Sequence, residues 1–289
     1  MIRVLILFGA ALAVRGAELL LGKVQPVPEA EAKELLRAVC PGPIAIDKED
    51  DDKGAWGCAT CPAYVMPFEW PSGWDLNFVH YGHFTTPTAD EAVLAMGGCA
   101  PHSDHFGATV LLARSEGRWR MKWFQSGLIT SRCIKVRHES GRDLLVCEAE
   151  DVAQGHEARE IFAVDFSLRP AARRIGLLAV EQYMNTCGEN VGKITNKIDP
   201  IQLAEYRRIA FDPVAAKLTV EVEYGWRPFT VENAHACREA QVKEMSLPAA
   251  LAPRTKVFNI DFDFNGEKFS VALGSKQAKR EVEAVHMSR

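Results

Sequence analysis

The stretch "CIKVRHESGRDLLVC", Cys133–Cys147, decides how this chain folds. Its centre, Glu139–Gly141, ends in a glycine that accepts the positive φ of a short hairpin turn. With that turn, Ile134 lies opposite Val146, and the two terminal cysteines lie opposite each other. Opposed Cβ atoms in an antiparallel pair are about 4.5–5.5 Å apart, and a disulfide needs ~3.5–4.5 Å. The stretch therefore predicts a β-hairpin closed by a Cys133–Cys147 disulfide.

A second hairpin is expected in "GATVLLARSEGRWRMKWF", residues 107–124. A three-residue turn at Ser115–Gly117 places Ala113 opposite Trp119 on an apolar face. The other face of the second strand then carries Arg118, Arg120 and Lys122. This division predicts one buried face and one solvated face.

A third hairpin is expected in "NIDFDFNGEKFSVAL", residues 259–273, with Asn265–Gly266 as a two-residue turn. In this register Phe262 lies opposite Phe269. The same stretch begins like a calcium-binding loop, but Ala272 stands where such a loop has its glutamate. The hairpin accounts for every residue, so we favour it over a metal loop.

The rest of the chain after about residue 75 also reads as strands joined by short turns. The clearest further strands are 160–166, 174–184, 206–211 and 217–225. Consecutive strands with short connections favour an antiparallel meander. We therefore expect a mainly β fold, either a large β-sandwich or a propeller-like array. One short N-terminal helix is expected at 27–40, before a disulfide-rich N-terminal region, and residues 276–289 are expected to form a short exposed helix or a frayed end.

The N-terminus has the pattern of a secretory signal peptide. Arg3 is followed by the apolar run Val4–Val14 and then by small residues. The run is shorter than the ~20 residues that span a bilayer. We expect residues 1–16 to be a signal peptide and 17–289 to be one exported β-rich domain, periplasmic or secreted. Residues 24–105 could form a cysteine- and aromatic-rich subdomain, and no membrane span is expected after signal removal.

The cysteine content agrees with export, because an even number of cysteines in an exported chain is typical of disulfides. The chain has eight cysteines. Besides Cys133–Cys147, we expect Cys187 to pair with Cys237. The remaining four form an N-terminal set whose pairing stays open: Cys40, Cys58, Cys61 and Cys99.

Two of that set, Cys58 and Cys61, form a CxxC motif that is also found in thiol–disulfide oxidoreductases. Such enzymes place the motif at a helix N-terminus, which lowers the pKa of the attacking thiol. Here Pro67 and Pro71 oppose a helix, and Pro62 replaces the histidine of a haem-attachment motif. We favour structural disulfides and keep an oxidoreductase as an alternative.

Histidines provide the second alternative, a metal-dependent hydrolase. Two H-x-x-H pairs with a nearby carboxylate could hold a divalent metal such as zinc: they are His80, His83, His102 and His105, with Asp104 between the last two. However, the first pair lies in a predicted strand, where residues three apart point to opposite faces. We expect no cofactor, and a divalent metal would bind at this cluster if at all.

Aromatic residues are concentrated between Trp56 and Phe84, where eight occur. Such residues either cover a loop-rich region or line a groove for a ligand. The groove hypothesis names Trp56, Trp70, Trp74 and Tyr81 as ligand-binding residues.

The net charge of −4 and the absence of a basic block make nucleic acid an unsuitable partner. The sequence therefore predicts an exported, disulfide-stabilised protein that is non-enzymatic. We expect it to bind a small molecule, a glycan or a protein.

Overall fold

The protein is described here by a computed structural model. The described residues are 17–20, 27–47, 55–65, 73–99, 107–153, 156–167, 172–183, 201–227 and 253–284. The predicted signal peptide, Trp70, His102, Asp104, His105, Cys187 and Cys237 lie outside these ranges.

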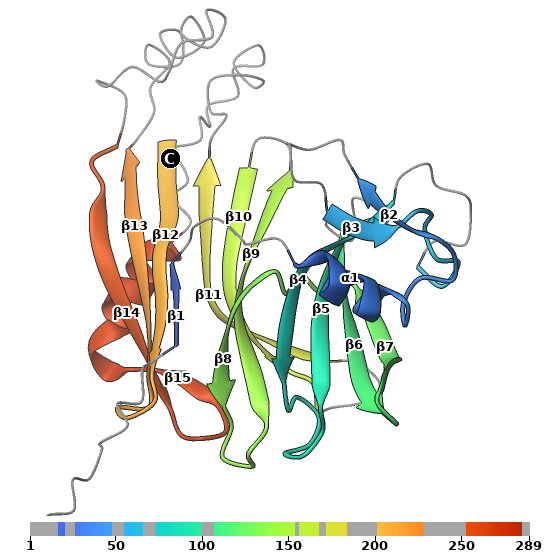
Figure 1. The fold of residues 1–289 in the computed structure, drawn as a ribbon. Helices are drawn as coiled ribbons and strands as arrows, with labels where there is room; N and C mark the ends of the chain where they lie inside the picture. The colour runs from blue at the N-terminus through green and yellow to red at the C-terminus, as the bar shows by residue number, and fades with distance from the viewer. Residues whose placement is uncertain are drawn as a thin grey trace, which may run out of the picture.

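The described chain forms two antiparallel sheets (Figure 1). The nine-stranded sheet has the spatial order β15 (Phe269–Val271), β14 (Lys256–Phe264), β13 (Lys217–Arg227), β12 (Ile201–Asp212), β11 (Arg173–Tyr183), β10 (His156–Asp165), β9 (Asp143–Ala153) and β8 (Arg132–Arg137), with β1 (Ala17–Leu20) paired to β12. The six-stranded sheet has the order β2 (Ile44–Asp47), β3 (Ala55–Cys58), β4 (Trp74–Gly82), β5 (Glu91–Gly98), β6 (Gly107–Ser115) and β7 (Arg118–Ser126). The helices are α1 (Glu29–Leu36), the 3-10 turn η3 (Leu273–Ser275) and α3 (Lys276–Val282).

The predicted meander is confirmed, because strands that follow one another in sequence are neighbours in each sheet apart from β1. This order follows from the short connections, which leave each strand little choice but to pair with the previous one. A propeller is built of repeated four-stranded blades, whereas the described chain forms one sheet of nine strands and one of six. Of the two expected architectures, the described chain therefore has the one with two packed sheets.

The hairpin of Cys133–Cys147 has the predicted register. Cys133 lies opposite Cys147, and Ile134 lies opposite Val146. The two cysteines are bridged, with Cα atoms 4.0 Å apart. This short separation matches a pair of the non-hydrogen-bonded kind, in which opposed Cα atoms approach to about 4.5 Å.

The register of the β6–β7 hairpin differs from the prediction. The turn contains Glu116 and Gly117, both with positive φ, so Arg114 rather than Ala113 lies opposite Trp119. Lys122 is an extra residue in β7 and forms a bulge. Because of this bulge, Trp123 lies opposite Leu111, so these two side chains point to the same face of the sheet, as the prediction also had them. Both central residues of a type I′ turn have positive φ, and a glutamate at such a position is not indicated by the sequence.

The third hairpin also turns differently. Asn265 N–H donates to the carbonyl of Lys268, so the loop is longer than the predicted Asn-Gly turn and Phe262 lies opposite Val271 instead of Phe269. Within the loop, Oδ1 of Asn265 accepts hydrogen bonds from the N–H groups of Glu267 and Lys268. In addition, Glu139 N–H donates to the carbonyl of Gly266 at 2.7 Å. This bond joins the turn of the β8–β9 hairpin to the turn of the β14–β15 hairpin.

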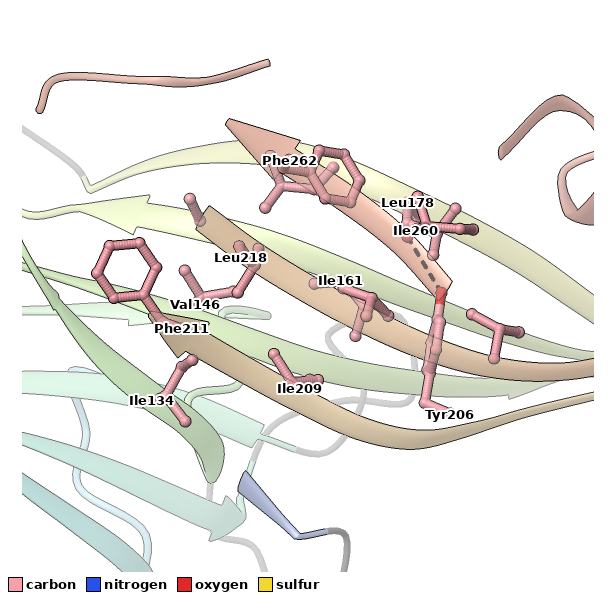
Figure 2. Packing of buried hydrophobic residues seen from close by; sticks show 14 of the residues in the cluster. Ile134, Val146, Ile161, Leu178, Tyr206, Ile209, Phe211, Leu218, Ile260 and Phe262 are labelled. Atoms are coloured by element: carbon pink, nitrogen blue, oxygen red, sulfur yellow. Dashed lines mark hydrogen bonds between the residues drawn. The ribbon is translucent and has the colours of Figure 1, made fainter. Parts of the chain in front are cut away.

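The larger sheet is therefore strongly curved, and its two ends approach each other at these turns. The concave side holds an apolar core to which β8–β14 all contribute (Figure 2). Tyr206 is fully buried there, and its hydroxyl lies 3.2 Å from the carbonyls of Arg159 and Leu178. Val282 of α3 is also fully buried in this core. The C-terminal helix is thus packed against the sheet on one side, where we expected an exposed or frayed end.

A second apolar layer joins the two sheets. Val93 and Leu111 of the smaller sheet pack with Leu145, Cys147 and Phe162 of the larger one. On its other face the smaller sheet is covered by α1, whose Leu35 and Leu36 are fully buried. β6 is consequently buried on both faces, which explains its continuous apolar run.

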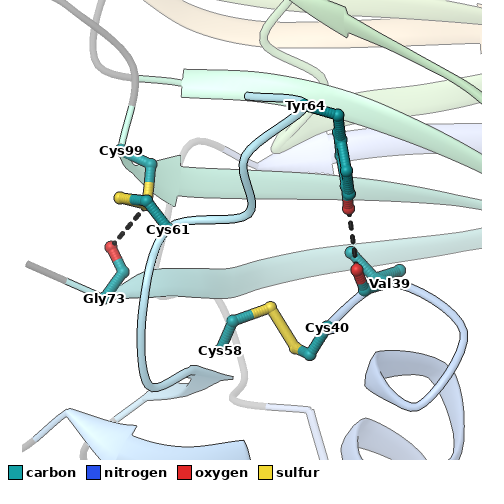
Figure 3. Close-up of a disulfide and its surroundings, with 7 residues drawn as sticks. All are labelled: Val39, Cys40, Cys58, Cys61, Tyr64, Gly73 and Cys99. Atoms are coloured by element: carbon teal, nitrogen blue, oxygen red, sulfur yellow. Dashed lines mark hydrogen bonds between the residues drawn. A yellow bond between two sulfur atoms is a disulfide. The ribbon is translucent and has the colours of Figure 1, made fainter. Parts of the chain in front are cut away.

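Two disulfides connect the N-terminal region to the smaller sheet (Figure 3). Cys40 is bridged to Cys58, and Cys61 is bridged to Cys99. Between them, the hydroxyl of Tyr64 donates to the carbonyl of Val39 at 2.8 Å. These bonds hold the end of α1 and the segment after β3 against the sheet.

Replacing both Cys133 and Cys147 by alanine is expected to lower the free energy of unfolding by about 3 kcal/mol, because the bridge closes a loop of roughly 15 residues in the unfolded chain. Equilibrium urea unfolding measures the loss. The matched variant Cys61→Ala/Cys99→Ala, whose bridge spans 38 residues, should lose somewhat more. An unchanged urea midpoint for the first variant would contradict this role of the bridge.

Candidate functional site

One exposed surface combines aromatic, sulfur-containing and cationic side chains. It lies beside α1 on the smaller sheet and consists of Tyr81 from β4, Arg114 from β6, and Trp119 and Met121 from β7. We call these four residues the Trp119 surface. Tyr81 is 40% exposed and Met121 is 37% exposed. Large side chains of these types are enriched in protein interfaces, so the surface is a candidate binding site.

The register of the hairpin assembles this surface. Arg114 lies directly opposite Trp119, and its guanidinium is 5.3 Å from the centroid of the indole ring. The ring of Tyr81 is also close, with its centroid 5.9 Å from that of Trp119 at an interplanar angle of 37°. A cation–π contact of this kind contributes about 0.5–1 kcal/mol at an exposed site. The indole thus contacts both a cation and a second ring.

Helix α1 holds the two flanking side chains. The hydroxyl of Tyr81 donates to Glu31 at 2.8 Å, and the guanidinium of Arg114 lies 3.5 Å from Glu34. Burial, followed by the hydrogen bond to Glu31, raises the pKa of Tyr81 above its ordinary value. Tyr81 therefore stays neutral and remains a donor. The surface is supported from below by strands and from one side by a helix, so a ligand would meet preordered side chains.

Trp119 and Met121 were not among the sequence-based candidates. The three-residue turn placed both of them on a buried face, and only the two-residue turn brings Trp119 opposite Arg114. The sequence did contain a signal for their contact. Arg114 and Trp119 flank a short turn, and residues in such positions can be cross-strand neighbours.

The predicted aromatic residues take separate positions. Trp74 is fully buried and stacks edge-on against Phe124 in the core beneath α1, so its ring offers no surface to a ligand. Trp56 is half-buried, and the Lys33 ammonium lies 4.3 Å from its ring centroid. Tyr81 alone of the described predicted residues belongs to the Trp119 surface, and Trp70 lies outside the described ranges.

The structure separates the two described histidines. His80 is buried within β4, and its Nε2 donates to the carbonyl of Thr130 at 2.8 Å. His83 follows the strand, and its Nδ1 lies 2.6 Å from the carbonyl of Ala89. Among the described residues, no group of three or more histidine, cysteine or acidic side chains is placed to hold a metal.

The two cysteines of the CxxC motif have different partners, Cys40 and Cys99. They do not form the internal disulfide through which a CxxC oxidoreductase cycles. Pro62 and the following turn also keep the motif from starting a helix. The motif anchors two structural bridges.

A shallow pocket lies on the outer face of the larger sheet. Its volume is about 240 Å³, and Ala149, Ala158 and Ala179 on three neighbouring strands contribute to its lining. At its rim Glu160 and Arg174 form an ion pair at 2.5 Å. The volume lies below the ~300–1,000 Å³ of ordinary ligand sites. The pocket's four charged lining residues pair with each other, Glu160 with Arg174 and Glu150 with Arg159. This pocket is therefore a weaker candidate than the Trp119 surface.

A buried ionic cluster adjoins the core of the curved sheet. Glu148 is 1% exposed, and its carboxylate lies 3.4 Å from Arg132 and 4.0 Å from Arg159. Burial raises the pKa of Glu148, although both arginines act in the opposite direction. Arg159 also pairs with Glu150 and Glu157. The arginines offset the charge of Glu148, but neither of its buried carboxylate oxygens accepts a hydrogen bond from the described residues, which agrees with the dominance of burial in its pKa shift.

None of the helices in the described ranges combines the length and apolar character that crossing a membrane requires.

Comparison of the chain with protein-family models, with curated proteins and with solved structures gave no match.

The buried His80 is expected to make stability depend on pH. Burial lowers its pKa from 6.5 to about 4, so the folded protein resists protonation that the unfolded chain accepts. The free energy of unfolding should therefore fall as the pH drops from about 6.5 to 4, by roughly 3 kcal/mol in total.

The variant His80→Gln tests this dependence, since an amide can still donate to Thr130. Urea unfolding at several pH values should show a shallower loss toward pH 4 in the variant than in the wild type. Glu148, whose pKa is raised, also makes the free energy of unfolding depend on pH, but it does so equally in both proteins. The difference between the two pH profiles therefore reports His80 alone. Parallel pH profiles for the two proteins would show that His80 is not responsible.

Proposed function

We propose that the protein acts outside the cytoplasm as a non-enzymatic binding protein and that the Trp119 surface is its contact site. The observation that supports the contact site most directly is the half-buried indole of Trp119, which contacts both Arg114 and Tyr81 beside the exposed Met121. Tryptophan, tyrosine and arginine are the residues that most often contribute large shares of binding energy at interfaces.

The rigidity of the surroundings favours binding over a catalytic role. Glu31 and Glu34 of α1 restrain the two flanking side chains, and the Cys40–Cys58 bridge ties the end of that helix to β3. A preordered surface loses little side-chain entropy on binding, so more of the contact energy appears as affinity. The arrangement contains an aromatic ring, a thioether and a cation, which recognise a partner but do not transfer protons at neutral pH.

Export is supported by the disulfides. Three bridges are present, and structural disulfides persist mainly in oxidising compartments. The signal-like N-terminus agrees with this location, periplasmic or secreted.

Photo-crosslinking in producing cells tests the contact site. A photoreactive amino acid at Met121 should give a partner adduct, and the adduct should disappear when Trp119→Ala is added. The matched control position is Val214, which is 84% exposed in a turn of the larger sheet. Equal adducts at both positions, or no effect of Trp119→Ala on the Met121 adduct, would contradict the proposed site.

Peptide mapping under non-reducing conditions tests the export. Material from the periplasm or the medium should begin near Ala17 and contain the pairs Cys40–Cys58, Cys61–Cys99 and Cys133–Cys147. We also expect Cys187 to be joined to Cys237. An intact N-terminus together with reduced cysteines would contradict export.

A further inference from the structure

Among the edge strands of the two sheets, β7 is the one that is long and pairs on one side only within the described chain. Proteins usually keep edge strands short or covered, because their unpaired backbone groups invite other strands. β15 has three residues and β2 has four, and the turn after β8 is bonded to Gly266. β7 has nine residues and pairs, among the described strands, with β6 alone.

The side chains of β7 divide by face. Trp119 and Met121 lie on the side of α1, opposite Arg114 and Leu112. Arg118 and Arg120 alternate with them and are exposed on the other side. A strand added to this edge would continue the same division, because residues opposite each other in neighbouring strands point to the same face.

The charge of the edge selects what can pair there. From Arg114 to Lys122 the chain has four basic residues and one acidic residue, Glu116, within a protein of net charge −4. Glu116 forms an exposed ion pair with Arg120 at 3.5 Å, so the stretch keeps a net positive charge. Two copies of β7 side by side would place like charges opposite each other, which destabilises the pair. An acidic strand would instead bring carboxylates to the arginines.

The bulge limits where pairing can occur. Lys122 is the extra residue between the pairs Leu111–Trp123 and Leu112–Met121, and a bulge interrupts the regular spacing of an edge. Tyr64 packs against Phe124 beyond the bulge, with ring centroids 5.4 Å apart. The part of the edge that is regular and that no other described strand covers is therefore Arg118–Met121.

We propose that an extended acidic segment of a partner protein adds to β7 along Arg118–Met121, with carboxylates toward Arg118 and Arg120 and apolar side chains toward Trp119 and Met121. This mode of recognition, in which backbone hydrogen bonds add a strand to a sheet, is common among peptide-binding proteins. The inference rests on the proposed function and specifies its partner as a segment with alternating acidic and apolar residues.

A synthetic peptide of about eight residues with alternating glutamate and valine is the probe, and fluorescence anisotropy measures its binding to the full chain. The glutamate peptide should bind at least about tenfold more tightly than the same peptide with lysine in place of glutamate. Its affinity should fall as salt is added.

Arg118→Glu/Arg120→Glu should weaken binding of the glutamate peptide by at least about tenfold. The matched control is Arg173→Glu/Lys256→Glu, which also reverses the charges of two exposed basic residues, both on the larger sheet, and should leave binding unchanged. Thermal unfolding checks that both variants fold. Equal losses in the β7 variant and the control would overturn the proposal, because charge alone would then account for binding.

Backbone pairing is tested by methylating alternate amide nitrogens of the peptide, once in each of the two possible phases. One phase should abolish binding, because it removes the donors that face β7. If both methylated peptides bind as tightly as the parent, strand addition is excluded. If the glutamate peptide does not bind although Trp119→Ala removes the crosslink at Met121, this inference fails and the proposed function stands.

Discussion

The apolar contact between the two sheets is the interaction on which the rest of the structure depends. Leu111 of β6 and Leu145 of β9 are fully buried in it, and the Cys133–Cys147 bridge lies within the same layer. Without this contact the smaller sheet would expose one whole apolar face of β5 and β6. Burial of such side chains contributes about 1.5–3 kcal/mol each, so this layer holds the two sheets together.

The contact also determines which strand edges remain open. It uses the inner strands of the smaller sheet and the β8–β10 end of the larger one, and the curvature of the larger sheet brings its remaining edge near the β8–β9 turn. The last strand of the smaller sheet, β7, is left at the periphery. A binding role for this strand is therefore a consequence of how the two sheets are joined, and the arginines on it give the edge a preference for acidic partners.

Much of this fold was predictable from local patterns. The hairpin of Cys133–Cys147 has both a clear turn and a covalent constraint, so its register could be counted from the sequence. The β6–β7 register could not, because Glu116 at positive φ carries no local signal and a change of one residue in the turn moves Trp119 relative to Arg114. The turn after Phe264 was also missed, although a local signal was present: Oδ1 of Asn265 accepts hydrogen bonds from the N–H groups of Glu267 and Lys268, and such side-chain bonds favour a longer turn. The candidate site was missed with the first of these two errors. Tyr81 was named, but Trp119 and Met121 were assigned to a buried face, whereas Trp119 is half-buried and Met121 is exposed.

The openness of the β7 edge is the central claim, and hydrogen exchange of the free protein tests it most directly. The amides of Arg118–Met121 that point away from β6 should exchange rapidly, while the amides of β6 and β9 stay protected on the timescale of global unfolding. Slow exchange at every β7 amide, comparable with that of β6, would show that another part of the chain already covers this edge and would contradict the account.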